Sequence, residues 1–191
     1  MATIVLVHGI DQQQRSADSL ENEWLPALAG GVRTAGFPAL ADRLWRVRSG
    51  PEGIETRLAF YGHLFLQPGQ QGDDPGDLNP DEAAFADALG EEWLVRGAER
   101  SADKKVQREA ARELVYLRGQ MGAQEQGVRH RVARPVINSL ARVPWFARFG
   151  LAFAERFVRK ALAQVTRYLT DDTIRENALT AVTDLECQHY F

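Results

Sequence analysis

The first 66 residues carry short apolar runs that predict strands, separated by a stretch with helical spacing. Residues 3–7, TIVLV, form an unbroken run of apolar and β-branched side chains that ends at His8-Gly9, and polar residues follow soon after. A short run rich in Val and Ile and bounded by glycine predicts a central parallel strand, buried on both faces. A second strand is predicted over residues 56–61.

The stretch between these strands has apolar residues at helical spacing and a glycine, Gly36, that suits a helix end. Pro26 predicts that this helix either begins near Glu23 or is kinked. Residues 40–47 fit a short strand and a continued helix equally well. The order strand, helix, strand predicts a parallel pair joined by a right-handed crossover.

Glycine, proline and aspartate dominate residues 67–80, which predicts a loop and a natural point for an insertion. Most of the remaining chain has helical patterning. One helix is expected to begin at Asp81-Glu82, whose carboxylates suit the positive end of the helix dipole. A second helix, charged and poorly buried, is expected over residues 101–120.

Residues 128–167 contain nine cations and one carboxylate, although the whole chain has a formal net charge of −3. Aromatic and aliphatic residues of this segment fall on one side of a predicted helix: Phe146, Phe149, Phe153, Phe157, Val158, Ala161, Leu162, Val165 and Leu169. The charged residues expected on the opposite, solvated side are Arg148, Glu155, Arg159, Lys160 and Arg167. Such a helix suits an anionic membrane surface, a protein partner, or packing against the rest of the chain.

The composition is that of an ordinary folded protein: of 191 residues, 45% are hydrophobic and 26% charged. No apolar run approaches the roughly 20 residues that cross a bilayer, and the first residues do not resemble a signal peptide. The single cysteine, Cys187, fits a reducing compartment, so a cytoplasmic location is expected. No phosphate-binding glycine motif, nucleic-acid recognition motif or metal-ligand cluster is present, so no cofactor, metal or nucleic acid is expected.

The residues VLVHGI, from Val5 to Ile10, resemble the first strand and turn of the α/β-hydrolase family, in which His-Gly follows a buried strand. The resemblance implies an oxyanion hole, to which the loop after this strand contributes a backbone N–H. By position, Ile10 or the adjacent Asp11 would supply that N–H, while His8 and Gly9 would shape the turn. One fixed donor of this kind lowers a reaction barrier by about 3 kcal/mol.

The order of features along the chain is also similar to a bacterial branch of lipase- or esterase-like hydrolases. It comprises a Gln-rich loop, a Trp-containing helix, a strand ending near Tyr61-Gly62, and a helical insertion before a last helix. The family's nucleophile motif, Gly-x-Ser-x-Gly, is absent from the sequence. The pattern therefore reads as interrupted after the last helix, by truncation, a frameshift or a divergent end.

The histidines do not supply the family's late catalytic base by position; they are His8, His63, His130 and His189. Cys187 and His189, two positions apart, are an unfavourable pair for a nucleophile and its base. His63 follows the second strand and is either a loop residue or a side chain that faces the same pocket as His8.

We therefore expect an α/β fold with a short parallel sheet and a large helical insertion, an incomplete α/β-hydrolase-like fold in a single domain. The expected parts are a β-α-β core at 1–66, a loop at 67–80, a helical insertion or cap at 81–169, and a capped helix and tail at 170–191. In the last part, Thr173 and Glu176 fit a capping box.

The resemblance implies kinship with serine esterases and lipases that act on a small ester or lipid-like substrate, in a chain that is catalytically incomplete. The alternative is a non-catalytic module that binds an anionic membrane or a protein partner through the basic amphipathic helix. Because two strands leave open sheet edges, self-association through such an edge is also expected.

Overall fold

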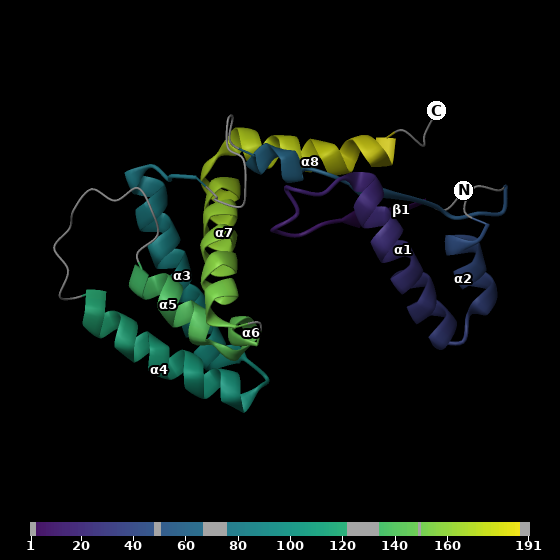
Figure 1. The fold of residues 1–191 in the computed structure, drawn as a ribbon. Coiled ribbons are helices and arrows are strands. Elements are labelled where there is room, and N and C mark those ends of the chain that lie inside the picture. Colours follow the sequence, from purple (N-terminus) through teal and green to yellow (C-terminus); the bar gives the residue numbers. More distant parts are fainter. Residues whose placement is uncertain (1–2, 48–50, 67–75, 122–133, 149, 188–191) are drawn as a thin grey trace. The chain divides into compact units, whose positions relative to one another are not determined.

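The chain forms two compact units, each with its own core (Figure 1). The computed structural model describes residues 3–47, 51–66, 76–121, 134–148 and 150–187. The first unit comprises residues 1–66 and 173–191, and the second comprises residues 67–172. The described residues are mostly helical and include a short parallel sheet of two strands, an arrangement compatible with a mixed α/β class.

The first unit contains the parallel sheet. Its elements are β1 (Thr3–Val7), α1 (Ala17–Thr34), α2 (Pro38–Trp45), β2 (Glu55–Ala59), the 3-10 turn η1 (Gly62–Phe65) and α8 (Asp172–Cys187). The strands pair in parallel from Thr3 opposite Glu55 to Val7 opposite Ala59. The expected parallel pair is therefore present, with α1 and α2 in the connection between its strands.

The helix after β1 begins earlier than Pro26 suggested. Ser16 is its N-cap, and Ser16 and Ser19 form a reciprocal capping box, so α1 starts at Ala17 and continues through Pro26. The ambiguous stretch at 40–47 is largely helical and contains no strand, because Pro38 suits the first position of a helix. In this helix Ala41 and Leu44 are buried. The two helices lie side by side as a hairpin (Figure 1).

The expectation that β1 is buried on both faces is wrong. Residues 4–6 are half-buried and Val7 is 51% exposed, because β2 is the one strand that pairs with β1 in the described part of the chain. On β2, the Leu58 N–H donates to the Glu21 carboxylate of α1 at 2.9 Å. This bond satisfies a strand amide that would otherwise be open to another chain.

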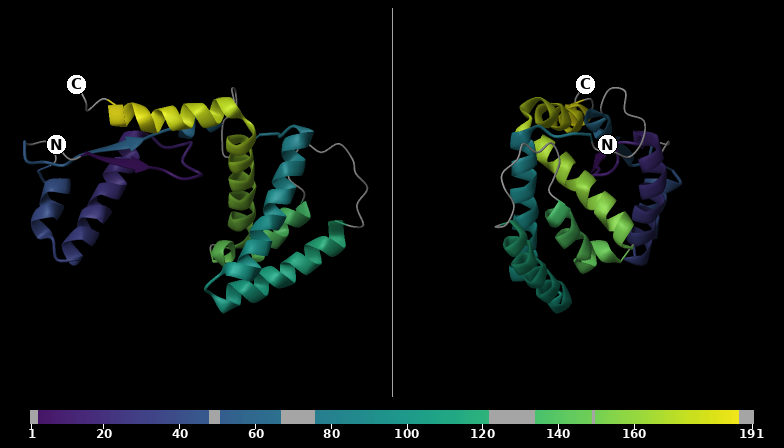
Figure 2. Two further views of the ribbon diagram at one scale, coloured as in Figure 1. Left: turned by 180° about the vertical axis from the view of Figure 1, so that it is seen from behind. Right: turned by 60° about the vertical axis from the view of Figure 1, so that its left-hand side comes forward.

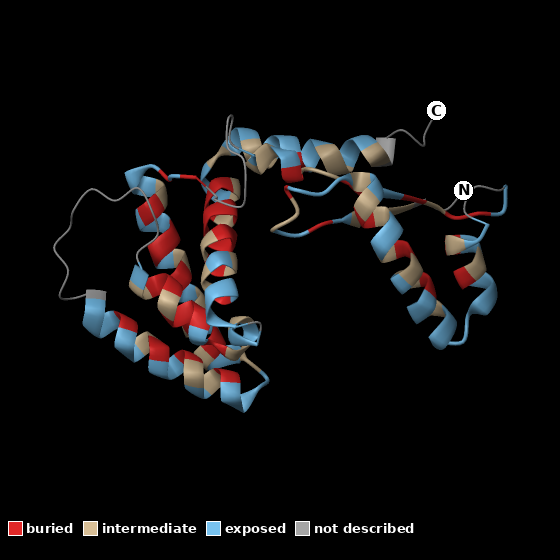
Figure 3. Ribbon diagram, in the orientation of Figure 1, coloured by how far each residue is buried: buried red, intermediate tan, exposed pale blue. Residues whose placement is uncertain are grey.

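The second unit is a helical bundle. Its elements are α3 (Pro80–Arg100), α4 (Lys104–Met121), α5 (Arg134–Arg142), α6 (Pro144–Ala147) and α7 (Leu151–Thr170). Helix α3 contacts α4, α5 and α7, and α5 contacts both α4 and α7, as the two further views of Figure 2 also show. Buried positions therefore line the facing sides of these helices (Figure 3).

Two predicted helices of this unit differ in detail from expectation. Helix α3 begins at Pro80, and Asn79 and Glu82 form its capping box. The expectation that the next helix is poorly buried is wrong, because α4 packs on both α3 and α5. Its inward residues recur at helical spacing and are Val106, Ala110, Glu113 and Leu117.

The charge pattern expected for α7 is also wrong in part. Lys160 and Arg167 are buried rather than solvated, whereas Phe153 and Leu169 are about half exposed. The reason is that α7 packs against both α3 and α5, so its buried face is wider than its apolar stripe. The Arg167 guanidinium donates to the Asp77 carbonyl at 3.1 Å, just before α3 begins. Phe149 lies outside the described residues.

Helix α8 begins at Asp172, so Thr173 lies inside the helix and the capping box expected at Thr173 and Glu176 is wrong. Apolar residues that recur at helical spacing on α8 are nevertheless less exposed than most of the helix; they are Ile174, Ala178, Ala181, Val182 and Leu185. Ala178 is buried, and residues 174, 181, 182 and 185 are half-buried. The helix expected in this part of the chain is therefore present, but it begins before the expected cap.

The contact between α3 and α5 gives a test of the second core. A Cβ on Gly90 would lie 2.3 Å from Val136 Cγ1, so we expect Gly90→Ala to lower the free energy of unfolding by about 1–3 kcal/mol. The matched control is Gly119→Ala on α4, where a Cβ meets nothing within 4 Å and should stabilise by about 0.5 kcal/mol. Urea unfolding followed by circular dichroism measures both; equal effects would contradict the close approach.

Candidate functional site

The loop that follows β1 lies at the carboxyl edge of the parallel pair. Because Val7 pairs with Ala59, His8 and Phe60 emerge from the same edge of the sheet. The carboxyl ends of parallel strands are where open α/β sheets bind ligands. The residues singled out from the sequence, His8 to Asp11, are therefore at the edge where such a site is expected.

His8 is 2% exposed, and hydrogen bonds occupy both of its ring nitrogens. Its Nδ1 donates to the Gly9 carbonyl at 2.8 Å, and its Nε2 accepts from the Tyr61 N–H at 3.0 Å. The Tyr61 hydroxyl donates to the His8 carbonyl, and the two rings stack with centroids 4.0 Å apart. These partners fix the neutral imidazole with its proton on Nδ1.

The environment of His8 opposes its protonation. Burial lowers the pKa of His8 from its ordinary value of 6.5, and the hydrogen bond to the Gly9 carbonyl raises it by a smaller amount. A proton on Nε2 would also remove the acceptor of the Tyr61 N–H. His8 is therefore a structural link between the ends of the two strands and has no free nitrogen for acid–base work.

The loop after His8 turns sharply and is packed against η1. Gly9 and Ile10 are exposed, and Asp11 has a φ of +65°, in the left-handed region that aspartate tolerates better than most residues. A Cβ on Gly62 would lie 2.9 Å from the Gln12 carbonyl oxygen, so a larger residue there would displace the loop. Glycine at position 62 thus allows the close approach.

The groups of this loop that can bind a ligand are main-chain N–H groups. Within the described residues, neither the Gly9 N–H nor the Ile10 N–H donates to a protein acceptor. Exposed N–H groups on a turn that is fixed at both ends can hold an anionic oxygen. The Asp11 carboxylate lies one residue away, where its charge opposes an anion unless it points elsewhere.

The other sequence candidates do not join His8. His63 lies exposed on η1, with its ring 6.0 Å from that of Phe60. Cys187 is the last residue of α8, and His130 and His189 lie outside the described residues. The described serines of the first unit are Ser16 and Ser19, and both form the cap of α1. Within the described residues, no serine is hydrogen-bonded to His8.

The sequence predicts Tyr61-Gly62 only as the end of a strand, and the structure adds its link to His8. A Tyr-Gly pair after the second strand of a parallel pair was the available signal, because it must lie beside the residues after the first. Glu21, which binds the outer edge of β2, gave no signal, since a carboxylate on an amphipathic helix is normally solvated.

No protein-family model, curated protein or solved structure matches this chain. Among the described helices, none is long and apolar enough to span a bilayer. The described part of the chain also contains no group of three or more His, Cys, Asp or Glu side chains arranged to bind a metal. The loop geometry is accordingly the basis for the function proposed below.

The lowered pKa of His8 predicts a pH-dependent stability. Well above pH 6.5 the imidazole is neutral in both folded and unfolded chains, so the contribution of His8 is complete. As the pH falls below 6.5, the unfolded chain binds a proton before the folded chain does, and the free energy of unfolding decreases. Urea unfolding between pH 5 and 8 measures this decrease.

The matched control is His63→Ala, which removes an exposed histidine and should leave the stability at pH 8 nearly unchanged. His8→Asn removes the titrating group and should flatten the slope while lowering stability at pH 8. If His8→Asn kept the slope of the original chain, the proposed link through neutral His8 would be wrong.

Proposed function

We propose that this chain is related to the α/β-hydrolases and supplies the oxyanion loop of a serine esterase or lipase that acts on an ester or lipid-like substrate. The observation that carries the proposal is the turn from His8 to Asp11 at the carboxyl end of β1, fixed against the end of β2. The residues of this turn belong to the motif by which the sequence resembles that family.

Acyl transfer builds negative charge on the carbonyl oxygen of the substrate. Main-chain N–H groups stabilise this charge when their positions are fixed before the reaction, because no reorganisation is then needed. The bonds of His8 to Gly9 and Tyr61 fix one end of the turn, and the close approach of Gln12 to Gly62 fixes the other. Ile10 and its neighbour Gly9 are the donors in this proposal.

The chain has no Gly-x-Ser-x-Gly motif, and His8 is occupied at both nitrogens. A serine hydrolase needs a nucleophile, a base and a carboxylate that orients the base. The proposal therefore assigns this polypeptide a part of the site and predicts that it has no esterase activity by itself.

The first test measures hydrolysis of p-nitrophenyl butyrate. Residues 1–191 alone should give no turnover above the uncatalysed rate. A chain extended after residue 191 by fusion to an α/β-hydrolase segment that carries Gly-x-Ser-x-Gly should hydrolyse the ester. In that extended chain, Ile10→Pro removes one N–H and should lower kcat about 100-fold.

The matched control is Ile10→Ala, which shortens the same side chain but keeps the N–H and should retain most of the activity. Turnover by residues 1–191 that a serine-directed phosphonate abolishes would overturn the assignment of an incomplete site. No turnover by the extended chain would overturn the kinship, and equal rates for its two Ile10 variants would overturn the oxyanion role.

A second candidate function is docking on an anionic membrane surface. Trp145 of α6 and Leu151 and Phe153 of α7 are each about half exposed, and Arg148 and Arg156 are exposed beside them in the chain. We call these five residues the α6–α7 corner. Aromatic and aliphatic side chains with adjacent cations are typical of segments that enter the interface of anionic bilayers.

Sedimentation with liposomes tests this candidate. Binding to phosphatidylserine liposomes should weaken at least tenfold in Arg148→Glu/Arg156→Glu, because each cation near the surface contributes about 1 kcal/mol. The matched control is Lys105→Glu/Arg108→Glu on exposed positions of α4, which makes the same charge change. Lys160 is unsuitable for reversal because it is buried. Equal loss in both variants, or no binding at low salt, would contradict docking by this corner.

A further inference from the structure

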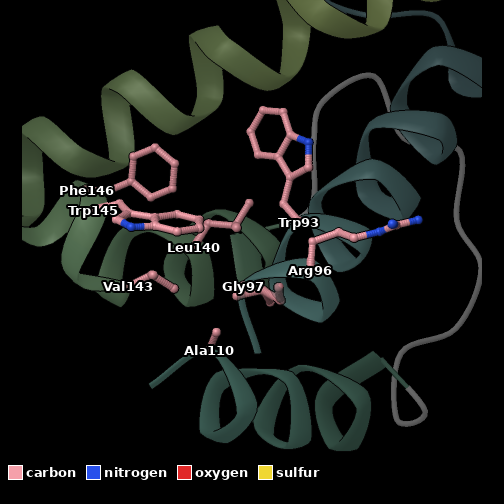
Figure 4. Close-up of a pocket in the computed structure, with 9 residues that line it drawn as sticks. Trp93, Arg96, Gly97, Ala110, Leu140, Val143, Trp145 and Phe146 are labelled. Carbon is pink, nitrogen blue, oxygen red and sulfur yellow. The ribbon is translucent and has the colours of Figure 1, made fainter. Parts of the chain in front are cut away.

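The second unit contains a pocket of about 310 Å³, and Trp145 of the α6–α7 corner forms part of its wall (Figure 4). Helix α3 contributes Trp93, Arg96 and Gly97 to its wall, and α4 contributes Ala110. The end of α5 and the start of α6 complete it with Leu140, Val143, Trp145 and Phe146. All these residues belong to one compact unit, so its shape is set within that unit.

Small residues and one turn create the space. Gly97 lies where α3 approaches α4 closely, since a Cβ there would be 3.2 Å from the Ala110 Cβ and 3.9 Å from the Trp145 ring. Pro144 then starts α6 directly after Val143 and places two large rings beside this gap. Trp145 remains 48% exposed, so one wall of the pocket lies at the protein surface.

The wall carries almost no group that would recognise a polar ligand. Apart from Arg96, its residues are aromatic, aliphatic or glycine. Arg96 forms an ion pair with Glu92 one turn away on α3, and in Figure 4 its guanidinium points away from the three aromatic rings. The part of a ligand that enters this pocket must therefore be hydrocarbon.

The size indicates how much hydrocarbon fits. An engineered apolar cavity of 150 Å³ binds benzene, so about 310 Å³ has room for about twelve carbon atoms. A single benzene-sized ring would leave half of the pocket empty. A flexible chain can instead follow a wall to which α3, α4, α5 and α6 contribute.

A row of rings connects the pocket with the surface. Phe146, which lines the pocket, has its ring 6.0 Å from that of Phe157, and Phe157 lies 6.4 Å from the exposed ring of Phe153. These three rings, which we call the apolar path, extend from the pocket wall to an exposed side chain, where the polar end of a bound chain can stay in water. We propose that the pocket binds the hydrocarbon chain of a single-chain amphiphile of about twelve carbon atoms, taken up as a monomer.

Tryptophan fluorescence tests the proposal directly, because Trp93 and Trp145 line the pocket. The reporter protein is the full chain with Trp24→Phe/Trp45→Phe, which removes the tryptophans of the first unit. The probe is 12-bromododecanoate below its micellar concentration, since bromine quenches an indole that it contacts. Quenching should saturate, and unbrominated dodecanoate should reverse it by competition.

Two variants of this reporter separate the pocket from general hydrophobic binding. Val143→Phe fills the space and should weaken binding at least tenfold, whereas Val115→Phe makes the same change at an exposed position of α4 and should bind normally. Because Val143 is buried and its variant could unfold, Trp145→Ala removes a half-exposed wall and should also weaken binding, with Trp93 as reporter. Circular dichroism checks the fold of each.

Three outcomes would overturn the proposal. The first is quenching that does not saturate or that dodecanoate does not reverse. The second is equal affinity of the folded Trp145→Ala variant and the reporter protein. The third is quenching by brominated lipid in vesicles without any quenching by monomeric 12-bromododecanoate. That result would mean that the apolar path contacts membranes and that the pocket does not bind a monomeric chain.

Discussion

The hydrogen bonds of neutral His8 join the two strands of the first unit where their carboxyl ends meet. The ladder between β1 and β2 holds the strands along five residue pairs, but a ladder alone does not fix the loops that leave it. His8 binds the Tyr61 N–H with one nitrogen and the Gly9 carbonyl with the other, and the Tyr61 hydroxyl binds back to the His8 carbonyl. The turn from His8 to Asp11 depends on this arrangement.

The same bonds decide what His8 does. A histidine beside a candidate oxyanion loop invites a role as a base, yet a base needs a nitrogen that can take a proton from a nucleophile. In this chain both nitrogens are occupied and burial favours the neutral ring. The chemistry available to the loop is therefore that of its exposed main chain, and the proposed function is built on those N–H groups.

The second unit combines a well-packed core with unusual surface and buried groups. Lys160 and Arg167 are buried on α7, while Trp145 and Phe153 are half exposed nearby in the chain. Polar groups buried in a core require partners, and the Arg167 guanidinium has one in the Asp77 carbonyl. Packing in the core does not account for the exposure of Trp145 and Phe153. The membrane and amphiphile proposals rest on these two residues.

The sequence by itself determined the elements whose signals are local. The apolar run at 3–7 with its glycine, the apolar spacing after residue 81 and the alternation of helix and strand before residue 66 all predicted elements that are present. These signals are local because strand and helix periodicities reflect which faces each element buries. The His8-Gly9 turn was likewise recognisable, as a motif at the end of a strand.

Tertiary structure alone decided which residues meet. The link of His8 to Tyr61 spans 53 positions, the bond from Leu58 to Glu21 spans 37, and the pocket joins residues of four helices. Lys160 and Arg167 are buried because α7 has neighbours on two sides, α3 and α5. The periodicity of α7 alone does not predict these neighbours. Such contacts follow from how elements pack, and packing depends on every neighbour at once.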